Sequence, residues 1–211
     1  MGEFPLFVDL KGVPCLVAGG GKVALRKTEA LLACSPRLTV TAPQVLPAFL
    51  DLERAGKLRL LRRAFRPEDL EGCFLAVAAT GDRAVNRHIA DLCRDRGILV
   101  NAADDQSACT CKFPAALRRG SLTIGVSTGG ASPTAARFVK ERIEALLPAG
   151  EADWEGILEF LAQSRGRVKQ RLPAEARAPV FRALFDRCMA LGRGLTGDEL
   201  EYVLKEAARD E

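Results

Sequence analysis

Residues 13–25 read Val-Pro-Cys-Leu-Val-Ala-Gly-Gly-Gly-Lys-Val-Ala-Leu, and this stretch decides the fold. An apolar run that stops at three glycines predicts a buried parallel strand, and the residues from Val23 onward predict a helix. In such a unit Gly19 permits a tight bend, Gly21 lets the backbone approach a pyrophosphate, and the small Ala24 lets the helix pack closely on the strand. The pattern favours a dinucleotide-binding turn, although three glycines alone often mark only a tight connection.

Strands and helices alternate on both sides of this turn. We expect strands at 4–10, 13–18, 37–41, 58–61, 74–79 and 98–100, and helices at 23–35, 45–55 and 82–96. Such short spacings imply right-handed βαβ crossovers and a parallel sheet. The predicted fold class is α/β, with a Rossmann-type sheet of strand order 3-2-1-4-5, counted from the strand at residue 13.

The pattern changes after Asn101. A polar loop is expected at 102–112, a short helix near 114–118, a strand at 121–127, a helix from Ser132-Pro133, and further helices at 154–164, 173–191 and 196–208. The predicted domains are a Rossmann domain at 1–113, a small α+β segment at 114–147 and an all-helical C-terminal domain at 148–211. Because the middle segment is too small for a core of its own, we expect it to pack on a partner subunit in a homodimer.

Composition excludes several classes of protein. Hydrophobic residues make up 48% of the 211 residues and charged residues 27%, which is typical of a globular protein. Without a long apolar run or a leader-like N-terminus, the chain is expected to be cytoplasmic with no membrane partner. The net charge of +4 is not gathered into basic stripes, so an anionic small molecule is favoured over nucleic acid. Seven scattered cysteines predict reduced thiols.

One feature of the usual NAD fingerprint is missing. An acid normally follows the second strand and binds the ribose hydroxyls, but here the sequence reads Thr41-Ala42-Pro43-Gln44. None of these four residues is an arginine that would favour a 2′-phosphate, so NAD⁺ is the predicted cofactor. Backbone groups and the Gln44 amide are the expected ribose contacts.

Polar residues follow two other predicted strands at the same edge of the sheet, where ligands of open α/β folds bind. Thr80 precedes Asp82, which is expected to cap the next helix. Asn101 precedes the adjacent acids Asp104 and Asp105, which should point to opposite sides of an extended segment. One acid is then able to face the ligand, although loop acids are usually only solvated.

A second helix start, residues 127–133, combines hydroxyls and glycines with an N-cap Ser132 and an N1 Pro133. Capping accounts for most of this pattern, and anion binding is an additional possibility. The single histidine, His88, is expected to be structural. Because the sequence has no other histidine, a His-rich metal site is excluded. Cys109 and Cys111 lack a second ligand pair nearby, so no metal site is predicted.

Taken together, these segments resemble the precorrin-2 dehydrogenase / sirohydrochlorin ferrochelatase family, the dehydrogenase part of siroheme synthase. The likeness is carried, in the family's order and spacing, by residues 5–10, 17–27, 78–80, 101–104 and 127–133. The resemblance implies a Rossmann domain, a dimerisation segment at 114–147 and a helical tail. It also implies NAD⁺-dependent oxidation of precorrin-2 to sirohydrochlorin, with Fe²⁺ (or Co²⁺) insertion expected as a second activity.

The resemblance also assigns roles to residues. It makes Asp104 the key acid, and it makes Lys22, Val23, Pro43 and Gln44 dinucleotide contacts. The expected cofactor residues are Gly19, Gly21, Lys22, Val23, Pro43, Gln44, Thr80 and Asn101. Those expected to bind the tetrapyrrole carboxylates are Ser127, Thr128, Gly129, Ser132, Arg119 and Arg137, with Arg26, Lys112 and Arg118 as further basic candidates.

Two alternatives stay open from the residues alone. An NAD-binding sensor or regulatory module would use the glycine turn but has no use for an acid at Asp104. A chelatase without dehydrogenase activity would use Asp104 but leaves the glycine turn unexplained. Neither the roles of Cys109 and Cys111 nor the function of the helical tail follows from the sequence.

Overall fold

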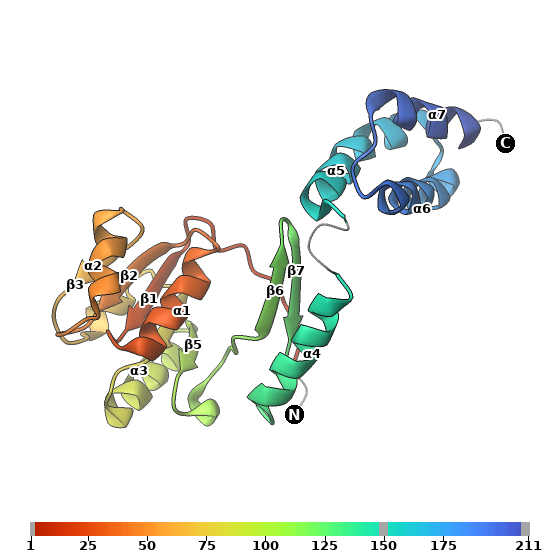
Figure 1. Ribbon diagram of the computed structural model, residues 1–211. Helices are drawn as coiled ribbons and strands as arrows, with labels where there is room; N and C mark the ends of the chain where they lie inside the picture. The colour runs from red at the N-terminus through yellow and green to blue at the C-terminus, as the bar shows by residue number, and fades with distance from the viewer. Residues whose placement is uncertain (1–2, 148–151, 208–211) are drawn as a thin grey trace. The chain divides into compact units, whose positions relative to one another are not determined.

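The computed structural model describes residues 3–147 and 152–207 (Figure 1). The chain divides into two compact units, residues 1–113 and residues 114–211. Each unit has a buried apolar core of its own.

The first unit is built on a five-stranded parallel sheet with the order β3-β2-β1-β4-β5. Its strands are β1 Pro14–Ala18, β2 Arg37–Thr41, β3 Arg59–Leu61, β4 Leu75–Ala78 and β5 Leu99–Ala102. The predicted Rossmann-type sheet and its strand order are confirmed. The observed strands differ from the expected ones only at their ends.

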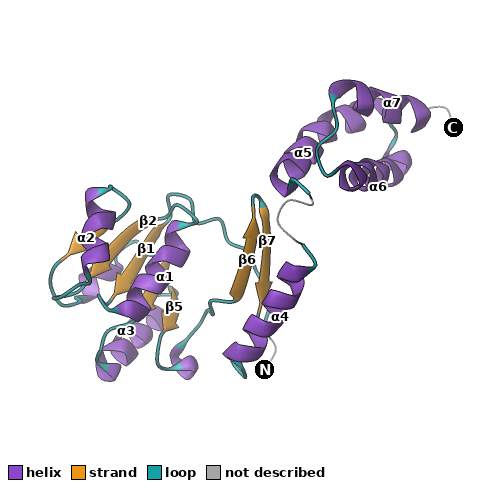
Figure 2. Ribbon diagram, viewed as in Figure 1, coloured by secondary structure: helices purple, strands orange, loops and turns teal. Residues whose placement is uncertain are grey.

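Helices cover both faces of this sheet (Figure 2). They are α1 Lys22–Leu32, α2 Pro47–Arg54 and α3 Arg83–Asp95, with short 3₁₀ helices η1 Pro67–Leu70 and η2 Gln106–Ala108 that the sequence did not predict. Successive strand residues face opposite sides. Val17 therefore packs with Phe49 of α2 in one core, whereas Leu16 packs with Ile89 of α3 in the other. The central strands are apolar because both of their faces are buried.

The strand register brings the candidate residues to one edge. Ala18, the last residue of β1, is paired with Thr41 on one side and with Ala78 on the other. Ala78 is in turn paired with Ala102 of β5. The turns that follow β1, β2, β4 and β5 therefore begin at the same level of the sheet.

The strand expected at residues 4–10 is absent from the structure, so this prediction was wrong. Residues 4–10 form no ladder with any described strand, and Phe4, Leu6 and Phe7 are exposed. Apolar alternation alone does not make a strand, because strand residues also need a neighbour for their backbone hydrogen bonds.

The second unit begins with a hairpin where we expected a helix. β6 Ala115–Arg119 pairs antiparallel with β7 Leu122–Val126, so the predicted helix near 114–118 was wrong. Ala and Leu favour helices, but here the cross-strand pairing overrides that local preference. Gly120, at φ +53°, helps to form the tight turn between the strands. Helix α4 Pro133–Ala145 packs on both strands.

Three helices complete the second unit: α5 Trp154–Arg171, α6 Ala174–Leu191 and α7 Gly197–Ala207. The predicted helices are confirmed, with α5 about two turns longer than expected because it ends at Arg171 instead of residue 164. Their shared core includes Ile157, Leu184 and Leu204. Gly192, at φ +67°, ends α6 in the left-handed conformation that the predicted break required. The domain boundary expected near 147 borders residues 148–151, which lie outside the described residues, as does residue 208 of the last expected helix.

All seven cysteines are free thiols. Within residues 3–147 and 152–207, we find no helix with the length and apolar character needed to cross a membrane.

Candidate functional site

The glycine turn after β1 is held by close backbone contacts. A Cβ on Gly19, whose φ is +134°, would lie 2.1 Å from the carbonyl oxygen of Ala79. A Cβ on Gly20 would lie 2.1 Å from the carbonyl oxygen of Gln44. Both glycines are therefore required by the approach of neighbouring turns. The steric role of Gly20 was not anticipated from the sequence, because it depends on the turn after β2.

Gly21 differs from the two glycines before it. It is the N-cap residue of α1 with extended backbone (φ −89°), and no side chain in the described part of the chain caps the helix. A Cβ on Gly21 would meet no described atom within 4 Å. Lys22 and Val23, which follow it, are exposed. The first N–H groups of α1 thus lack a side-chain acceptor beside open space, an arrangement that suits a phosphate group.

The turn after β2 offers backbone and amide groups but no acid. The Thr41 hydroxyl donates to the carbonyl of Arg63 at 3.1 Å, so it is already used within the fold. Pro43 and Gln44 are exposed. The Gln44 side chain is therefore the remaining polar group of this turn with access to a ligand.

The turn after β4 is organised by a residue that sequence reasoning missed. Asn86 of α3 is 1% exposed, and its Oδ1 accepts from the Thr80 backbone N–H at 2.9 Å and from the Thr80 hydroxyl at 2.7 Å. Its Nδ2 donates to the Thr80 carbonyl at 3.2 Å. Thr80 was expected to contact the cofactor, but its backbone N–H and carbonyl are already hydrogen-bonded to Asn86. The signal available in the sequence was a polar residue at helical spacing from the apolar Ile89, Ala90 and Cys93, which share its face of α3.

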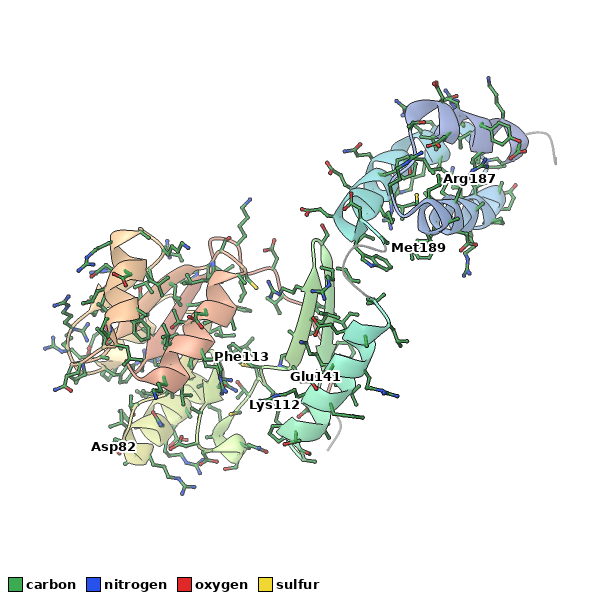
Figure 3. All side chains as sticks on the ribbon, viewed as in Figure 1. Asp82, Lys112, Phe113, Glu141, Arg187 and Met189 are labelled. Atoms are coloured by element: carbon green, nitrogen blue, oxygen red, sulfur yellow. The ribbon has the colours of Figure 1, made fainter. Side chains whose placement is uncertain are left out.

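Asp82 caps α3, as predicted. Its Oδ1 accepts from the N–H groups of Ala84 at 2.8 Å and Val85 at 3.3 Å. Figure 3 shows Asp82 at the start of this helix. The cap fixes the first turn of α3 and, with it, the position of Asn86.

The Asp105 carboxylate makes its contacts within the fold. It caps η2 by accepting from the Ser107 N–H at 2.9 Å and the Ser107 hydroxyl at 2.6 Å, and it pairs with Arg87 at 2.6 Å. The Ser107 hydroxyl, followed by the Arg87 charge and the backbone N–H groups, holds the pKa of Asp105 below its usual range. Asp105 therefore acts as a structural acid.

Asp104 has a different environment. It is exposed directly after β5, and its Oδ1 accepts from Asn86 Nδ2 at 3.1 Å. The carboxylate is thus held by a buried amide while remaining accessible. Of the two adjacent acids after β5, Asp104 is the more exposed one.

Asn101 lies at the end of β5 and is 6% exposed. Its Nδ2 donates to the Cys111 carbonyl at 3.1 Å, while its Oδ1 has no partner among the described residues. A buried acceptor without a donor is costly. The amide group of a bound ligand would relieve that cost, which fits the predicted role of Asn101 in cofactor binding.

Lys27 is a second residue that the sequence did not single out. Its Nζ lies 4.1 Å from the ring centre of Phe113, and burial lowers the pKa of Lys27. Cys111 is close enough to Lys27 to affect it electrostatically, and burial raises the pKa of the Cys111 thiol to about 11. Figure 3 labels Lys112 and Phe113, where the first unit ends. The Cys111 side chain therefore remains a neutral thiol near neutral pH.

The turn before α4, in the second unit, is stabilised by its own hydroxyl groups. Thr128 Oγ1 accepts from the Ser132 N–H at 3.1 Å, and the Ser127 hydroxyl accepts from the Gly129 N–H at 3.2 Å. Ser132 caps α4 by accepting from the Ala135 N–H at 3.1 Å, as predicted. These bonds account for the pattern structurally, and Ser127 and Gly129 remain exposed.

Arg119 and Arg137, the two main arginines expected to bind substrate, differ in their ion pairing. Arg119 is paired with Glu144 at 3.0 Å, and the Glu144 pKa is lowered, mainly by its hydrogen bond to Lys140. Arg137 is exposed and forms no ion pair within the described ranges. Arg137 is therefore the more available of the two for an anionic ligand.

The donor set of this edge suits an organic dinucleotide. An uncapped helix start, open space at Gly21 and an unpaired Asn101 oxygen match a phosphate and an amide group. Where the structure describes the chain, no group of three or more His, Cys, Asp or Glu residues is placed to hold a metal ion.

Comparison with known families defines the class of the chain. A model described as putative NAD(P)-binding matches residues 6–115, more than half of the chain, and the chain belongs to this family. A second model, sirohaem biosynthesis protein central, matches residues 119–146. The dinucleotide-binding domain predicted from the glycine turn is confirmed, with a nicotinamide dinucleotide as the class of cofactor.

Comparison with individual proteins shows which members the chain resembles. The chain is 40% identical to the siroheme synthase of Chromobacterium violaceum over 93% of its own length and 41% of the relative, and 38% identical to that of Methylococcus capsulatus over 99% and 44%. It thus spans about two fifths of the length of these relatives. A solved structure of "SirC, precorrin-2 dehydrogenase" matches with a TM-score of 0.74 and 27% identity, covering 98% of this chain and 100% of that one. The family resemblance drawn from the sequence is confirmed.

Proposed function

We propose that the chain oxidises precorrin-2 to sirohydrochlorin with NAD⁺ as oxidant. The observation that carries the proposal is the joint placement, at one sheet edge, of the uncapped α1 start and the accessible Asp104 carboxylate held by Asn86. The siroheme synthase relatives and the precorrin-2 dehydrogenase fold support the choice of substrate. A sensor module has no use for the acid, and a pure chelatase has no use for the glycine turn.

The reaction removes a hydride and a proton from the substrate, giving sirohydrochlorin, NADH and H⁺. When bound, the nicotinamide supplies the hydride acceptor. Asp104 is proposed to accept the proton, since it is exposed and carries a single described hydrogen bond, from Asn86. The α1 N–H groups beside Gly21 are proposed to bind the pyrophosphate, with Lys22, Val23, Pro43, Gln44 and Asn101 as further contacts.

NAD⁺ is proposed over NADP⁺ because of the turn after β2. Its residues 41–44 supply no arginine or lysine for a 2′-phosphate, and Gln44 is the exposed polar side chain. An amide suits ribose hydroxyls better than it suits a dianion.

Substrate carboxylates are proposed to bind Arg137, Arg119, Ser127, Thr128, Gly129 and Ser132. Arg137 carries the strongest case because it is exposed and uncompensated in the described residues, whereas Arg119 already pairs with Glu144. Fe²⁺ insertion is proposed as a second activity in which Asp104 takes pyrrole protons as the cation enters. The macrocycle supplies the nitrogen ligands, so this step does not require a resident metal site.

A homodimer is proposed from exposed apolar side chains. Phe4, Leu6 and Phe7 in the first unit and Phe138 and Leu146 in the second are exposed. Large apolar side chains exposed to solvent in this number favour association with a partner. We retain the division of the second unit into a dimerisation segment, residues 114–147, and a helical tail, residues 148–211. The free thiols are compatible with the proposed cytoplasmic location.

The test is anaerobic incubation of the purified chain with precorrin-2 and either NAD⁺ or NADP⁺, followed by addition of Fe²⁺. Sirohydrochlorin is expected to form with NAD⁺ at least about tenfold more efficiently, as judged by kcat/KM, than with NADP⁺. Siroheme is expected after Fe²⁺ addition. No sirohydrochlorin from folded protein would contradict the dehydrogenase, and no acceleration over free Fe²⁺ would contradict the second activity alone.

A further inference from the structure

Asn86 is a buried amide with all of its hydrogen-bonding capacity in use. Two groups of Thr80 donate to Oδ1, while Nδ2 donates to the Thr80 carbonyl and to Asp104 Oδ1. Asn86 is 1% exposed, whereas Asp104 is exposed. A single side chain of α3 therefore joins the turn after β4 to the acid after β5.

The orientation of this amide is fixed by its partners. The Thr80 N–H is able only to donate, so it requires the amide oxygen, and the Thr80 carbonyl is able only to accept, so it requires the amide nitrogen. The second N–H of Asn86 must then point toward Asp104. A flipped amide would break both backbone bonds and would turn the amide oxygen toward the Asp104 carboxylate.

We infer that Asn86 is a positioning residue, whose buried amide holds the Asp104 carboxylate in the orientation needed to accept a substrate proton. The inference rests on the proposed function. Burial of Asn86 between fixed backbone partners makes its donor rigid, while Asp104 would otherwise be a surface side chain free to rotate. Proton transfer requires the carboxylate within hydrogen-bond reach of the substrate, so lost orientation costs rate.

A purely structural role predicts something different. Replacing Asn86 would then lower stability and affect cofactor binding and turnover together, with or without the acid at Asp104. A positioning role predicts that the loss in turnover depends on Asp104. A double-mutant cycle separates these two cases.

The experiment compares wild type, Asn86→Ala, Asp104→Asn and the double variant. Asn86→Ala is expected to lower kcat for precorrin-2 oxidation on the order of 10²-fold, with the NAD⁺ Kd changed by less than about threefold. Added to Asp104→Asn, it should change kcat by less than about threefold. An equal loss in both backgrounds, or a parallel loss of NAD⁺ affinity, overturns the inference.

A second variant tests the inference in case Asn86→Ala does not fold. Asn86→Asp keeps the shape of the side chain and the acceptor for the Thr80 N–H, but it replaces the nitrogen that donates to Asp104 and to the Thr80 carbonyl by an oxygen. Its thermal midpoint should be low, and adding Asp104→Asn should raise it because the amide introduced at position 104 donates to the new carboxylate. No such rise overturns the proposed contact.

The stability arm also separates this inference from the proposed function. If wild type forms no NADH, the proposed function fails, while the thermal coupling between positions 86 and 104 still tests the hydrogen bond. If wild type is active and the cycle is additive in kcat, only the positioning role fails. The matched control is Asp91→Asn, an exposed position on the same helix, which should keep wild-type kcat and NAD⁺ affinity.

Discussion

The two halves of the sheet edge present different kinds of chemical group, backbone groups in one half and side chains in the other. Beside β1 and β2 the surface is backbone: two glycines demanded by close carbonyl groups, and an α1 start without a side-chain cap. Beside β4 and β5 it is made of side chains, with Thr80, Asn86 and Asp104 joined by hydrogen bonds. Backbone groups suit the constant phosphates of a cofactor, whereas a proton acceptor must be an ionisable side chain. On our proposal the half beside β1 and β2 binds the cofactor phosphates and the half beside β4 and β5 carries the proton acceptor, with Asn101 of β5 as a further cofactor contact.

The strongest test of the difference between the two halves is to replace the adjacent acids Asp104 and Asp105 one at a time. Asp104→Asn should lower turnover by about 10²- to 10⁴-fold, because an amide is unable to accept the proton, while NAD⁺ affinity is retained. Asp105→Asn should lower turnover by less than about threefold, since Asn is also a good N-cap and Asp105 faces η2 and Arg87. Steady-state kinetics and NAD⁺ titration measure both. Equal effects of the two changes would remove the distinction between a reactive and a structural acid.

The glycine turn offers a second matched pair of substitutions, one at Gly21 and one at Gly20. Gly21→Ser should stabilise the protein by a few tenths of a kcal/mol, because its hydroxyl caps α1. The same hydroxyl competes for the N–H groups that the pyrophosphate would use, so NAD⁺ affinity should fall about tenfold, or about 1.4 kcal/mol.

Gly20→Ala is the control for Gly21→Ser. Its added Cβ would meet the Gln44 carbonyl, so it should lower the thermal midpoint instead of stabilising the fold. Calorimetric unfolding and NAD⁺ titration distinguish the outcomes. Unchanged NAD⁺ affinity in Gly21→Ser contradicts the phosphate site.

The smallest expected effect is on pH dependence. The pKa of Asp105 is lowered in the folded protein, first by the Ser107 hydroxyl, so its stabilising contribution is present above its unfolded pKa and is lost as the pH falls through the folded value. The thermal midpoint of wild type should therefore fall more steeply below about pH 4 than that of Asp105→Asn. Parallel curves for the two proteins would show that Asp105 does not contribute to this pH dependence.

The backbone half was the easier half to predict from the sequence. Strand periodicity and the three glycines gave the sheet, its order and the α1 start, because these are local patterns. The hairpin at β6 was missed because cross-strand pairing overrides the helix preference of Ala115 and Leu117. Residues 4–10 failed as a strand for the converse reason, since the described chain supplies them no neighbour.

The side-chain half depended more on three-dimensional contacts. Asp104 was singled out through the family motif, but nothing in its spacing distinguished it physically from Asp105. Asn86 was overlooked because its partners, Thr80 and Asp104, lie in two different turns that only the sheet brings together. Such contacts join residues far apart in the chain, and a local sequence pattern does not show which side chains meet.

The most direct test of a binding half beside a reactive half is a single turnover with excess enzyme over precorrin-2 in the presence of NAD⁺. NADH absorbance and sirohydrochlorin absorbance should rise together and in equal amounts in wild type, and both should be absent in an Asp104→Asn protein that still binds NAD⁺ with wild-type affinity. Sirohydrochlorin formation without NADH, or unimpaired turnover by Asp104→Asn, would contradict this division of the site.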